Sequence, residues 1–418
     1  MGRIKLNAAS QLIALGTVLG LQTVYLFVVA RHLGPADFGW FSFAWSIVQV
    51  LLIVGDLGLH NTTLREISVR REDSVRSSRQ LLWLKLRLSL LLAALPFLLG
   101  FLLDIRPGVH LALSVFGLGM FFQSLSVAVN ILFQAHGRLY LASLNIALLF
   151  ACQFVLGMVL IALGGGLSAL AFAYAIASLL ALVSNLLLFR ALVHPLTWTH
   201  PPVDWRACLR ESLPVGIFNI FQTTGSRLTI WMLVFLVTPV EAGLFAAAFR
   251  PPASLYNVPL GVLSAALPVF AAHQADPASI RPVAAKALVA LEAFALVTGV
   301  LLWSLAGPLI ALIYGPQYTA SVACLRILAW CLVPACLSMV FQHVLLSQNR
   351  LVALLPWVGG GGILLSLGLC LWLIPTLGSI GASWAVLLTE SGMASAYAVL
   401  GGGFLLGRIW SREPGVAA

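Results

Sequence analysis

The chain has 418 residues, of which 61% are hydrophobic and only 9% carry a charge, against roughly 25% charged residues in soluble domains. No water-soluble core could bury so much apolar surface, so the surrounding solvent is lipid and most soluble enzyme classes are excluded. The formal net charge is +10. In a membrane protein this basic excess indicates topology signals beside anionic lipid, and nucleic acid is not an expected partner.

Apolar runs long enough for a membrane-spanning helix of roughly 20 residues recur along the whole chain. Helix is expected for each of them, because lipid offers backbone polar groups no other partner and the runs lack the alternation of a β-barrel. The composition therefore predicts an all-α membrane protein of about twelve transmembrane helices. The expected spans are 9–30, 39–57, 81–103, 111–133, 141–163, 166–190, 213–236, 246–272, 284–307, 322–345, 351–374 and 378–407.

The basic residues divide unequally between the two sides of the membrane when the loops between these spans alternate. Eighteen of the 23 Lys and Arg residues fall on one side, Lys85 at the inner end of span 81–103 among them, and only Arg31 and Arg106 on the other. The remaining three are Arg227, Arg250 and Arg326, in or at the edge of spans. Because cytoplasmic loops carry the excess of Lys and Arg, both termini are predicted to be cytoplasmic and the number of spans even.

Cysteine usage gives no sign of a metal centre or a disulfide framework. The six cysteines lie mostly within apolar runs and none has metal-ligand spacing. They are interpreted as small buried apolar residues, and neither a metal nor another cofactor is expected.

An internal repeat relates the two halves of the chain at an offset of 204 residues. An acid, a Gly, a Phe, an Ala and an aromatic residue recur in register in 37–45 and 241–249. Chance similarity in low-diversity apolar sequence is the alternative to duplication. Duplication predicts a six-helix bundle over 1–190, a cytoplasmic linker over 191–212 and a second six-helix bundle over 213–418. Parallel repeats of this kind usually enclose a central substrate cavity.

Polar residues recur at helical spacing along one face of four spans. A single buried Ser or Asn would indicate only helix packing, whereas a stripe on each of four spans calls for a further interpretation. Two interpretations are open: a wet, elongated path that offers partners to sugar hydroxyls, or hydrogen bonds between packed helices. The residues expected to line a glycan path are Gln49, Gln123, Asn130, Asn219, Gln222, Thr223 and Asn257.

Four segments resemble, in order and spacing, those of polysaccharide-transporter flippases. They are residues 30–39, 242–250, 308–318 and 325–330, and the likeness covers nearly the whole chain. This family shares its superfamily with the multidrug and toxin extrusion (MATE) transporters, so the resemblance implies a MATE-like fold. One departure concerns the acid that often follows the arginine of span seven in the family. Here Leu228 and Thr229 follow Arg227, which weakens the case for acid-dependent ion coupling there.

The resemblance implies a substrate and a location. The substrate would be undecaprenyl-diphosphate-linked oligosaccharide, moved from the cytoplasmic to the outer leaflet by alternating access for surface polysaccharide biosynthesis. The protein would then lie in the bacterial cytoplasmic (inner) membrane, in contact with membrane lipid. Polysaccharide polymerase or ligase proteins would be its further partners.

The three arginines of the spans are the expected diphosphate ligands, because a guanidinium can fork onto phosphate oxygens. Arg227 lies about 14 residues into its span, roughly 20 Å from the cytoplasmic end and too deep for easy snorkelling. Arg250 precedes Pro251 and Pro252, where a new helical segment is expected after a break, and Arg326 opens its span near the outer face. Snorkelling of Arg250 and Arg326, or a structural ion pair of Arg227, would be the alternative.

Three acids complete the set of candidate groups: Asp56, Glu292 and Glu390. They are expected either to pair with the arginines or to take up protons or sodium during transport. His60 is interpreted as an interfacial residue beside the basic loop.

Two other functions compete with the flippase. A cation-coupled multidrug-type exporter of the same superfamily would need a cavity rich in acids, whereas the spans place three arginines against two deep acids. A membrane enzyme such as a polymerase or glycosyltransferase would need a sizeable outer loop with acids or histidines. The sequence has no such loop, so an enzyme is not expected.

Overall fold

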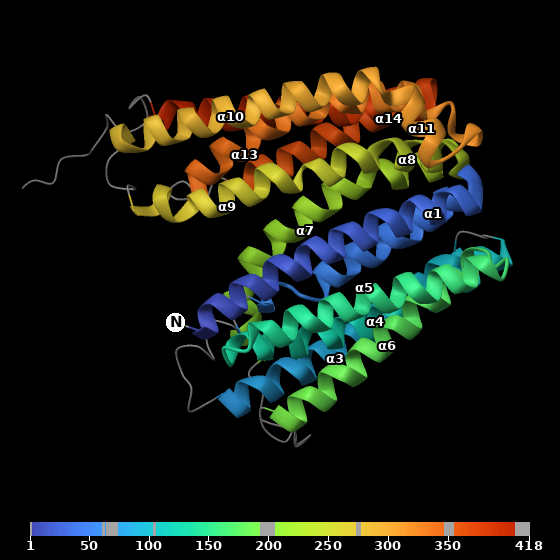
Figure 1. Cartoon of the computed structure of the whole chain (residues 1–418), viewed down its shortest axis with the longest axis vertical. Coiled ribbons are helices and arrows are strands. Elements are labelled where there is room, and N and C mark those ends of the chain that lie inside the picture. The colour runs from blue at the N-terminus through green and yellow to red at the C-terminus, as the bar shows by residue number, and fades with distance from the viewer. Residues whose placement is uncertain are drawn as a thin grey trace, which may run out of the picture. The chain divides into compact units, whose positions relative to one another are not determined.

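The computed structural model describes residues 2–60, 63, 74–102, 106–192, 205–272, 277–346 and 355–405. All regular secondary structure within these residues is helical (Figure 1). The helices group into two compact units, Met1–Thr223 (unit 1) and Thr224–Ala418 (unit 2). The division falls inside one long helix, α7, so that helix contributes residues to both units.

Among the described residues, unit 1 contains five helices and the first part of α7. They are α1 (Gly2–Val54), α3 (Ser74–Leu102), α4 (Pro107–Ala135), α5 (Leu139–Ala162), α6 (Leu167–Leu192) and α7 (Trp205–Leu236). Helix α1 holds two spans, because Gly34 has a φ of 73° and kinks the chain before Pro35. Glycine adopts this left-handed conformation without the steric penalty of a side chain.

Among the described residues, unit 2 contains the rest of α7 and seven further helices. They are α8 (Pro239–Leu255), α9 (Asn257–Ala272), α10 (Pro277–Ser304), α11 (Ala306–Ile313), α12 (Ser321–Leu328), α13 (Leu332–Leu346) and α14 (Leu355–Leu405). Short 3-10 turns cover Pro316–Tyr318 and Ala329–Cys331. Helix α14 bends at Gly378, whose φ of 57° again separates two spans.

Eight helices of the described residues are long and apolar enough to cross a membrane. Two of these stretches, Gly20–Val54 and Trp357–Gly401, contain the glycine kinks and supply two spans each. With α7 and the broken α8–α9 segment, the described helices cover all twelve expected spans. The chain is an all-α, multi-pass membrane protein.

The division into bundles expected at 191–212 stays a prediction. Most of that stretch lies outside the described residues, and α7 begins at Trp205. The two compact units divide about ten residues later, between Thr223 and Thr224.

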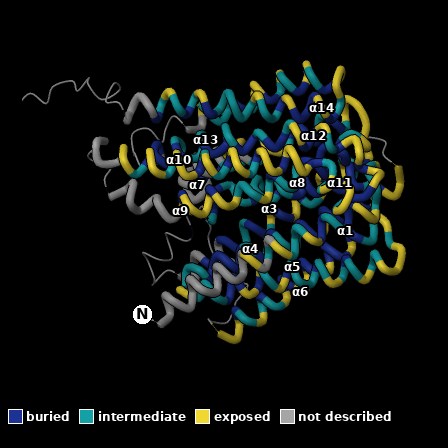
Figure 2. Tube along the Cα trace, turned by 45° about the horizontal axis from the view of Figure 1, so that its top comes forward, coloured by how far each residue is buried: buried dark blue, intermediate teal, exposed yellow. Residues whose placement is uncertain are grey.

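Large apolar side chains are exposed at helical spacing along several helices, where Figure 2 shows exposed and buried stretches in alternation. On α6, for example, Phe172, Ile176 and Leu180 are exposed. Leu371 and Trp372 are exposed on α14. A soluble protein would bury such continuous apolar surface, so these faces are suited to acyl chains.

The sequence repeat coincides with two equivalent helix starts. In unit 1, Pro35 follows the kink and Asp37 stands two residues later. In unit 2, Pro239 occupies the first turn of α8, and the N–H of Glu241 donates to the hydroxyl of Thr238. Proline suits the first helical turn because its missing N–H has no partner there, and an acid stabilises the positive end of the helix dipole.

The helix break near Arg250 lies later than expected. Pro251 and Pro252 are inside α8, which continues to Leu255, and α9 begins at Asn257. Pro259 accounts for the end of α8, because it lacks the N–H that would bond the carbonyl of residue 255, and in an uninterrupted helix its ring would clash with that carbonyl. The Asn257 amide donates to the Ser254 carbonyl at 3.1 Å, which satisfies one of the orphaned acceptors at this end.

Candidate functional site

A cavity of about 430 Å³ with both polar and apolar lining residues lies within unit 1. Its wall is formed by α1 and the turn that follows it, α3, α4 and the first part of α7. Expected site residues Gln49, Asp56 and Asn219 come together here. The other lining residues are Leu52, Ile53, His60, Lys85, Ser124 and Val127. A cavity of this size falls in the range typical of small-ligand sites.

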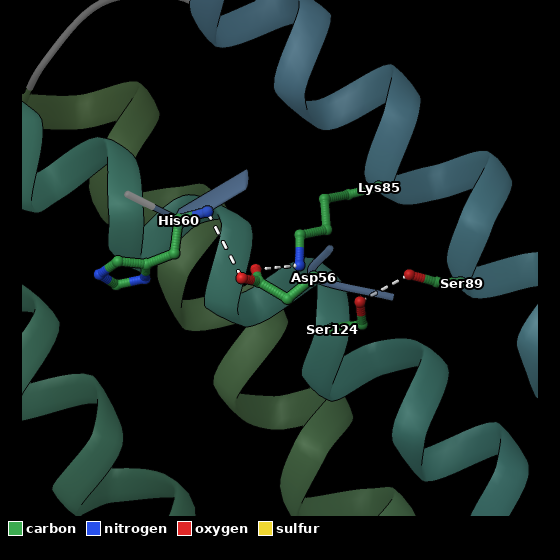
Figure 3. A network of polar contacts seen from close by, with 5 residues as sticks. All are labelled: Asp56, His60, Lys85, Ser89 and Ser124. Atoms are coloured by element: carbon green, nitrogen blue, oxygen red, sulfur yellow. Dashed lines mark hydrogen bonds and ion pairs between the residues drawn. The ribbon is translucent and has the colours of Figure 1, made fainter. Parts of the chain in front are cut away.

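An ion pair between Asp56 and Lys85 lies in the wall of this cavity (Figure 3). The Lys85 ammonium donates to Oδ1 of Asp56 at 2.6 Å, and the two side chains are only 2% and 17% exposed. Next to the pair, the Ser89 hydroxyl donates to the Ser124 hydroxyl at 2.6 Å. Loss of either ion would leave the other charge buried without compensation.

Lys85 is the site residue that sequence reasoning missed. As a base at the inner end of a span it counts as a topology signal, whereas the structure buries it among helices. The sequence holds one signal for this position, because Leu81, Lys85 and Ser89 follow one another at four-residue spacing and therefore share a helix face. The structure buries all three residues. A lysine on the buried face of a helix needs a counter-charge. Asp56 supplies it, so this acid pairs with a lysine and not with an arginine.

The turn after α1 fixes Asp56 against α7. Leu57 and Gly58 have positive φ values of 46° and 79°. A Cβ on Gly216 of α7 would lie 2.6 Å from the Leu57 carbonyl oxygen, and a Cβ on Gly58 would overlap the Ser212 carbonyl. Only glycine allows the two backbones this approach.

His60 lines the cavity next to Asp56. Its backbone N–H lies 3.5 Å from Oδ2 of Asp56, a distance at which a hydrogen bond is weak. Figure 3 shows the imidazole directed away from that carboxylate. Burial lowers the pKa of His60 below 6.5; Asp56 raises it and Lys85 lowers it. The ring is therefore neutral at physiological pH.

Two expected path residues of α4 are not among those lining the cavity. The amide oxygen of Gln123 accepts a short hydrogen bond from the hydroxyl of Tyr174 on α6, which is a contact between packed helices. Asn130 is buried, and among the described residues its Oδ1 has no hydrogen-bond partner. Polar residues on one helix face therefore serve different roles.

In unit 2, two arginines act on one another. Arg227 on α7 and Arg250 on α8 lie close enough for their charges to interact, and Tyr314 is also within range of Arg250. Both arginine side chains are half-buried. Within the described part of the chain, Nε of Arg227 has no hydrogen-bond partner. Two like charges beside each other repel, so this arrangement favours a bound anion.

Arg326 and Asn257 are exposed in unit 2. The Arg326 guanidinium lies 5.6 Å from the centre of the Trp303 ring, a cation–π arrangement on the surface. Asn257 uses its amide for the local cap of α8. Thr223 is half-buried. The side chain of Gln222 lies outside the described residues.

Two acids are half-buried in the same unit. Oε1 of Glu292 has no hydrogen-bond partner among the described residues. Glu390 acts electrostatically on Tyr256 and Cys331. No ion pair with an arginine is present for either acid among the described side chains. The part of the chain that the structure describes contains no cluster of three or more potential metal ligands.

Comparison with known proteins places the chain in a family. The family model described as "Polysaccharide biosynthesis protein" matches residues 6–274. The chain belongs to the polysaccharide biosynthesis protein family. The comparison with curated proteins found no match to this chain.

Solved structures show the fold of this family member. An inward-facing multidrug resistance MATE family transporter of the MOP superfamily matches with a TM-score of 0.76 and 16% identity, over 95% of this chain and 96% of that one. A MOP superfamily transporter from Pyrococcus furiosus, described as having a binding pocket of reverse polarity, matches with a TM-score of 0.67, 15% identity and 96% coverage of both chains. An outward-facing MATE family transporter matches with a TM-score of 0.66 and 17% identity, over 97% of each chain. The fold is that of MATE transporters, and family and fold together support a membrane exporter.

Proposed function

We propose that this protein is a flippase that moves undecaprenyl-diphosphate-linked oligosaccharide from the cytoplasmic to the outer leaflet of the bacterial inner membrane. The family match supports a role in polysaccharide biosynthesis, and the fold supports alternating access. The observation that carries the choice of substrate is the interaction of Arg227 with Arg250, with Nε of Arg227 unpartnered among the described residues. A diphosphate would relieve their repulsion and accept their hydrogen bonds.

The proposed cycle assigns the substrate's three parts to different surroundings. Arg227 and Arg250 bind the diphosphate, and exposed Arg326 assists at the membrane surface. Polar residues bind the glycan, while the polyprenyl tail stays in lipid. Both termini face the cytoplasm, as the distribution of basic residues predicts.

The test is transport into inverted membrane vesicles from a deletion strain that carries plasmid-borne variants. A radiolabelled undecaprenyl-diphosphate oligosaccharide is supplied, and lumenal exposure of its glycan is measured. Arg227→Ala is expected to lower the initial rate by roughly tenfold or more, because a charge-assisted contact with phosphate is lost. Arg227→Lys should be intermediate, since an ammonium keeps the charge but cannot fork onto two oxygens.

Arg87→Ala is the matched control. This exposed arginine of α3 lies over the Trp83 ring, 5.9 Å from its centre, and should transport normally. Full glycan exposure by Arg227→Ala at equal protein levels would refute the assignment. Energy-dependent export of a lipophilic cation in place of the glycan would select the multidrug-type exporter.

A further inference from the structure

The cavity of unit 1 combines hydrogen-bond donors and acceptors with no net charge. Asp56 and Lys85 neutralise one another at 2.6 Å. His60 is neutral, because burial lowers its pKa. The remaining polar lining consists of the Gln49 and Asn219 amides and the Ser124 hydroxyl. This cavity therefore differs in character from the arginine pair of unit 2.

The polar groups around the cavity retain unused hydrogen-bonding capacity. Lys85 has three N–H donors, and one of them is used by Oδ1 of Asp56. Oδ2 of the same carboxylate has only the long 3.5 Å contact with the His60 N–H among the described residues. Ser124 accepts from Ser89 and keeps its own hydroxyl proton for a further acceptor. A ligand in the cavity would find donors and acceptors side by side.

Three ligand chemistries can be compared with this lining. A diphosphate needs a net positive site, which Asp56 prevents by neutralising Lys85. A lipophilic cation needs unpaired acids or aromatic faces, and His60 supplies the only ring among the described lining residues. A sugar presents hydroxyls that both donate and accept, together with C–H surface that Leu52, Ile53 and Val127 can contact. Mixed polar groups on an apolar bed fit the sugar best.

We propose that the cavity of unit 1 is a binding site for a neutral, hydroxyl-rich sugar, with the Asp56–Lys85 pair as its specificity-determining element. This inference rests on the proposed function and divides its substrate chemically: the sugar binds in unit 1 and the diphosphate at the arginines of unit 2. The ion pair holds a carboxylate and an ammonium side by side, a combination that can bind adjacent hydroxyls of one ring. Gln49 and Asn219 add further contacts from α1 and α7.

The experiment is isothermal titration calorimetry, in which the full-length protein in lipid nanodiscs is titrated with three soluble probes. They are the oligosaccharide released from the host's own lipid-linked intermediate, inorganic pyrophosphate, and tetraphenylphosphonium. Asn219→Ala and Gln49→Ala should each weaken oligosaccharide binding by roughly three- to tenfold, the loss of one hydrogen-bonded group. The double variant Asp56→Leu/Lys85→Met, which removes both charges together, should weaken it by more than tenfold.

Two comparisons separate a binding defect from a folding defect. Gln22 lies on the same helix, α1, but its side chain lines a different and much smaller cavity. The Gln22→Ala variant should therefore bind the oligosaccharide as the wild type does. The cavity variants should bind pyrophosphate with unchanged affinity, which shows that the protein is folded. Arg227→Ala should show the reverse pattern and lose pyrophosphate alone.

The outcomes decide the inference separately from the proposed function. Oligosaccharide binding that is absent in the wild type, or unchanged in the double variant, overturns the sugar site. Tetraphenylphosphonium binding that depends on Asp56 also overturns it. If the oligosaccharide binds as expected but vesicles show no glycan exposure, the sugar site stands and the flippase proposal fails. If glycan exposure is normal but the cavity binds no oligosaccharide, the flippase proposal stands and the sugar site fails.

Discussion

The two units treat buried charge in different ways. In unit 1, Asp56 and Lys85 form a close pair inside the helices, so neither charge requires a ligand. In unit 2, Arg227 and Arg250 repel one another, and Oε1 of Glu292 has no hydrogen-bond partner among the described residues. A charge that the fold itself neutralises can stay buried without a ligand, although the pair as a whole adds little net stability. A buried charge that the fold leaves uncompensated destabilises the protein, and it therefore indicates a site where a substrate or an ion supplies the missing partner.

The sharpest way to break this comparison is to remove one partner of the pair in unit 1. Lys85→Met or Asp56→Leu alone should destabilise the protein by about 3–5 kcal/mol, because each leaves an uncompensated buried charge. The double variant Asp56→Leu/Lys85→Met should lie within about 1 kcal/mol of the wild type, since both desolvation penalties disappear together. Chemical unfolding of the purified protein in detergent measures all three.

Arg227→Met is the matched experiment in unit 2. This substitution removes a half-buried guanidinium whose Nε has no partner among the described residues, so stability should be unchanged or improved. A loss as large as that of Lys85→Met would mean that Arg227 is part of a structural ion pair. The contrast between the two units would then disappear, and with it the reason to expect an anion there.

A smaller effect is expected where the turn after α1 contacts α7. Gly216→Ala and Gly58→Ala should each cost about 1–3 kcal/mol, because the added methyl overlaps backbone atoms that cannot move independently. Gly261→Ala in α9 is the control: nothing lies within 4 Å of its Cβ position, so it should be neutral or stabilising by about 0.5–1 kcal/mol. Wild-type stability of Gly216→Ala would show that α7 is not held by this turn.

Much of the fold could be predicted because the spans are set by the thickness of the bilayer. Apolar runs of sufficient length mark each span. Gly34 separates the two spans of α1, and Gly378 separates the two spans of α14. The break near Arg250 could not be placed as well. Pro251, Pro252 and Pro259 stand close together there, and the sequence does not show which of them ends a helix. In the structure, α8 continues through Pro251 and Pro252 and ends before Pro259.

The site was less predictable than the fold, because a stripe of polar residues on a helix looks the same in the sequence whether it lines a cavity or packs against another helix. Gln49 and Gln123 both lie on polar stripes, yet Gln49 lines the cavity while Gln123 bonds Tyr174 in the packed interior. Lys85 illustrates the opposite difficulty. Its position at the end of a span predicts a topology signal, and only the placement of Asp56 opposite it shows a buried pair.

The smallest expected effects concern the repeated acids, Asp37 and Glu241, which occupy equivalent helix starts. Asp37 lies 3.3 Å from Arg106 in an exposed pair, whereas Glu241 accepts the backbone N–H of Ser379 at 2.8 Å, directly after the kink in α14. Glu241→Ala should cost about 1–2 kcal/mol, since it leaves a partly buried N–H without its acceptor. Asp37→Ala should cost at most about 1 kcal/mol, as is usual for exposed pairs.

Salt separates the two roles of these acids. The Asp37–Arg106 pair is exposed, so high ionic strength should remove most of the cost of Asp37→Ala. The cost of Glu241→Ala should persist, because the hydrogen bond to Ser379 does not depend on long-range charge. Glu241→Gln keeps an acceptor oxygen but loses the charge, which weakens the hydrogen bond to Ser379 and removes the interaction with the helix dipole, the latter worth about 0.3–1 kcal/mol. Equal salt dependence of the two alanine variants would mean that both acids have the same electrostatic role.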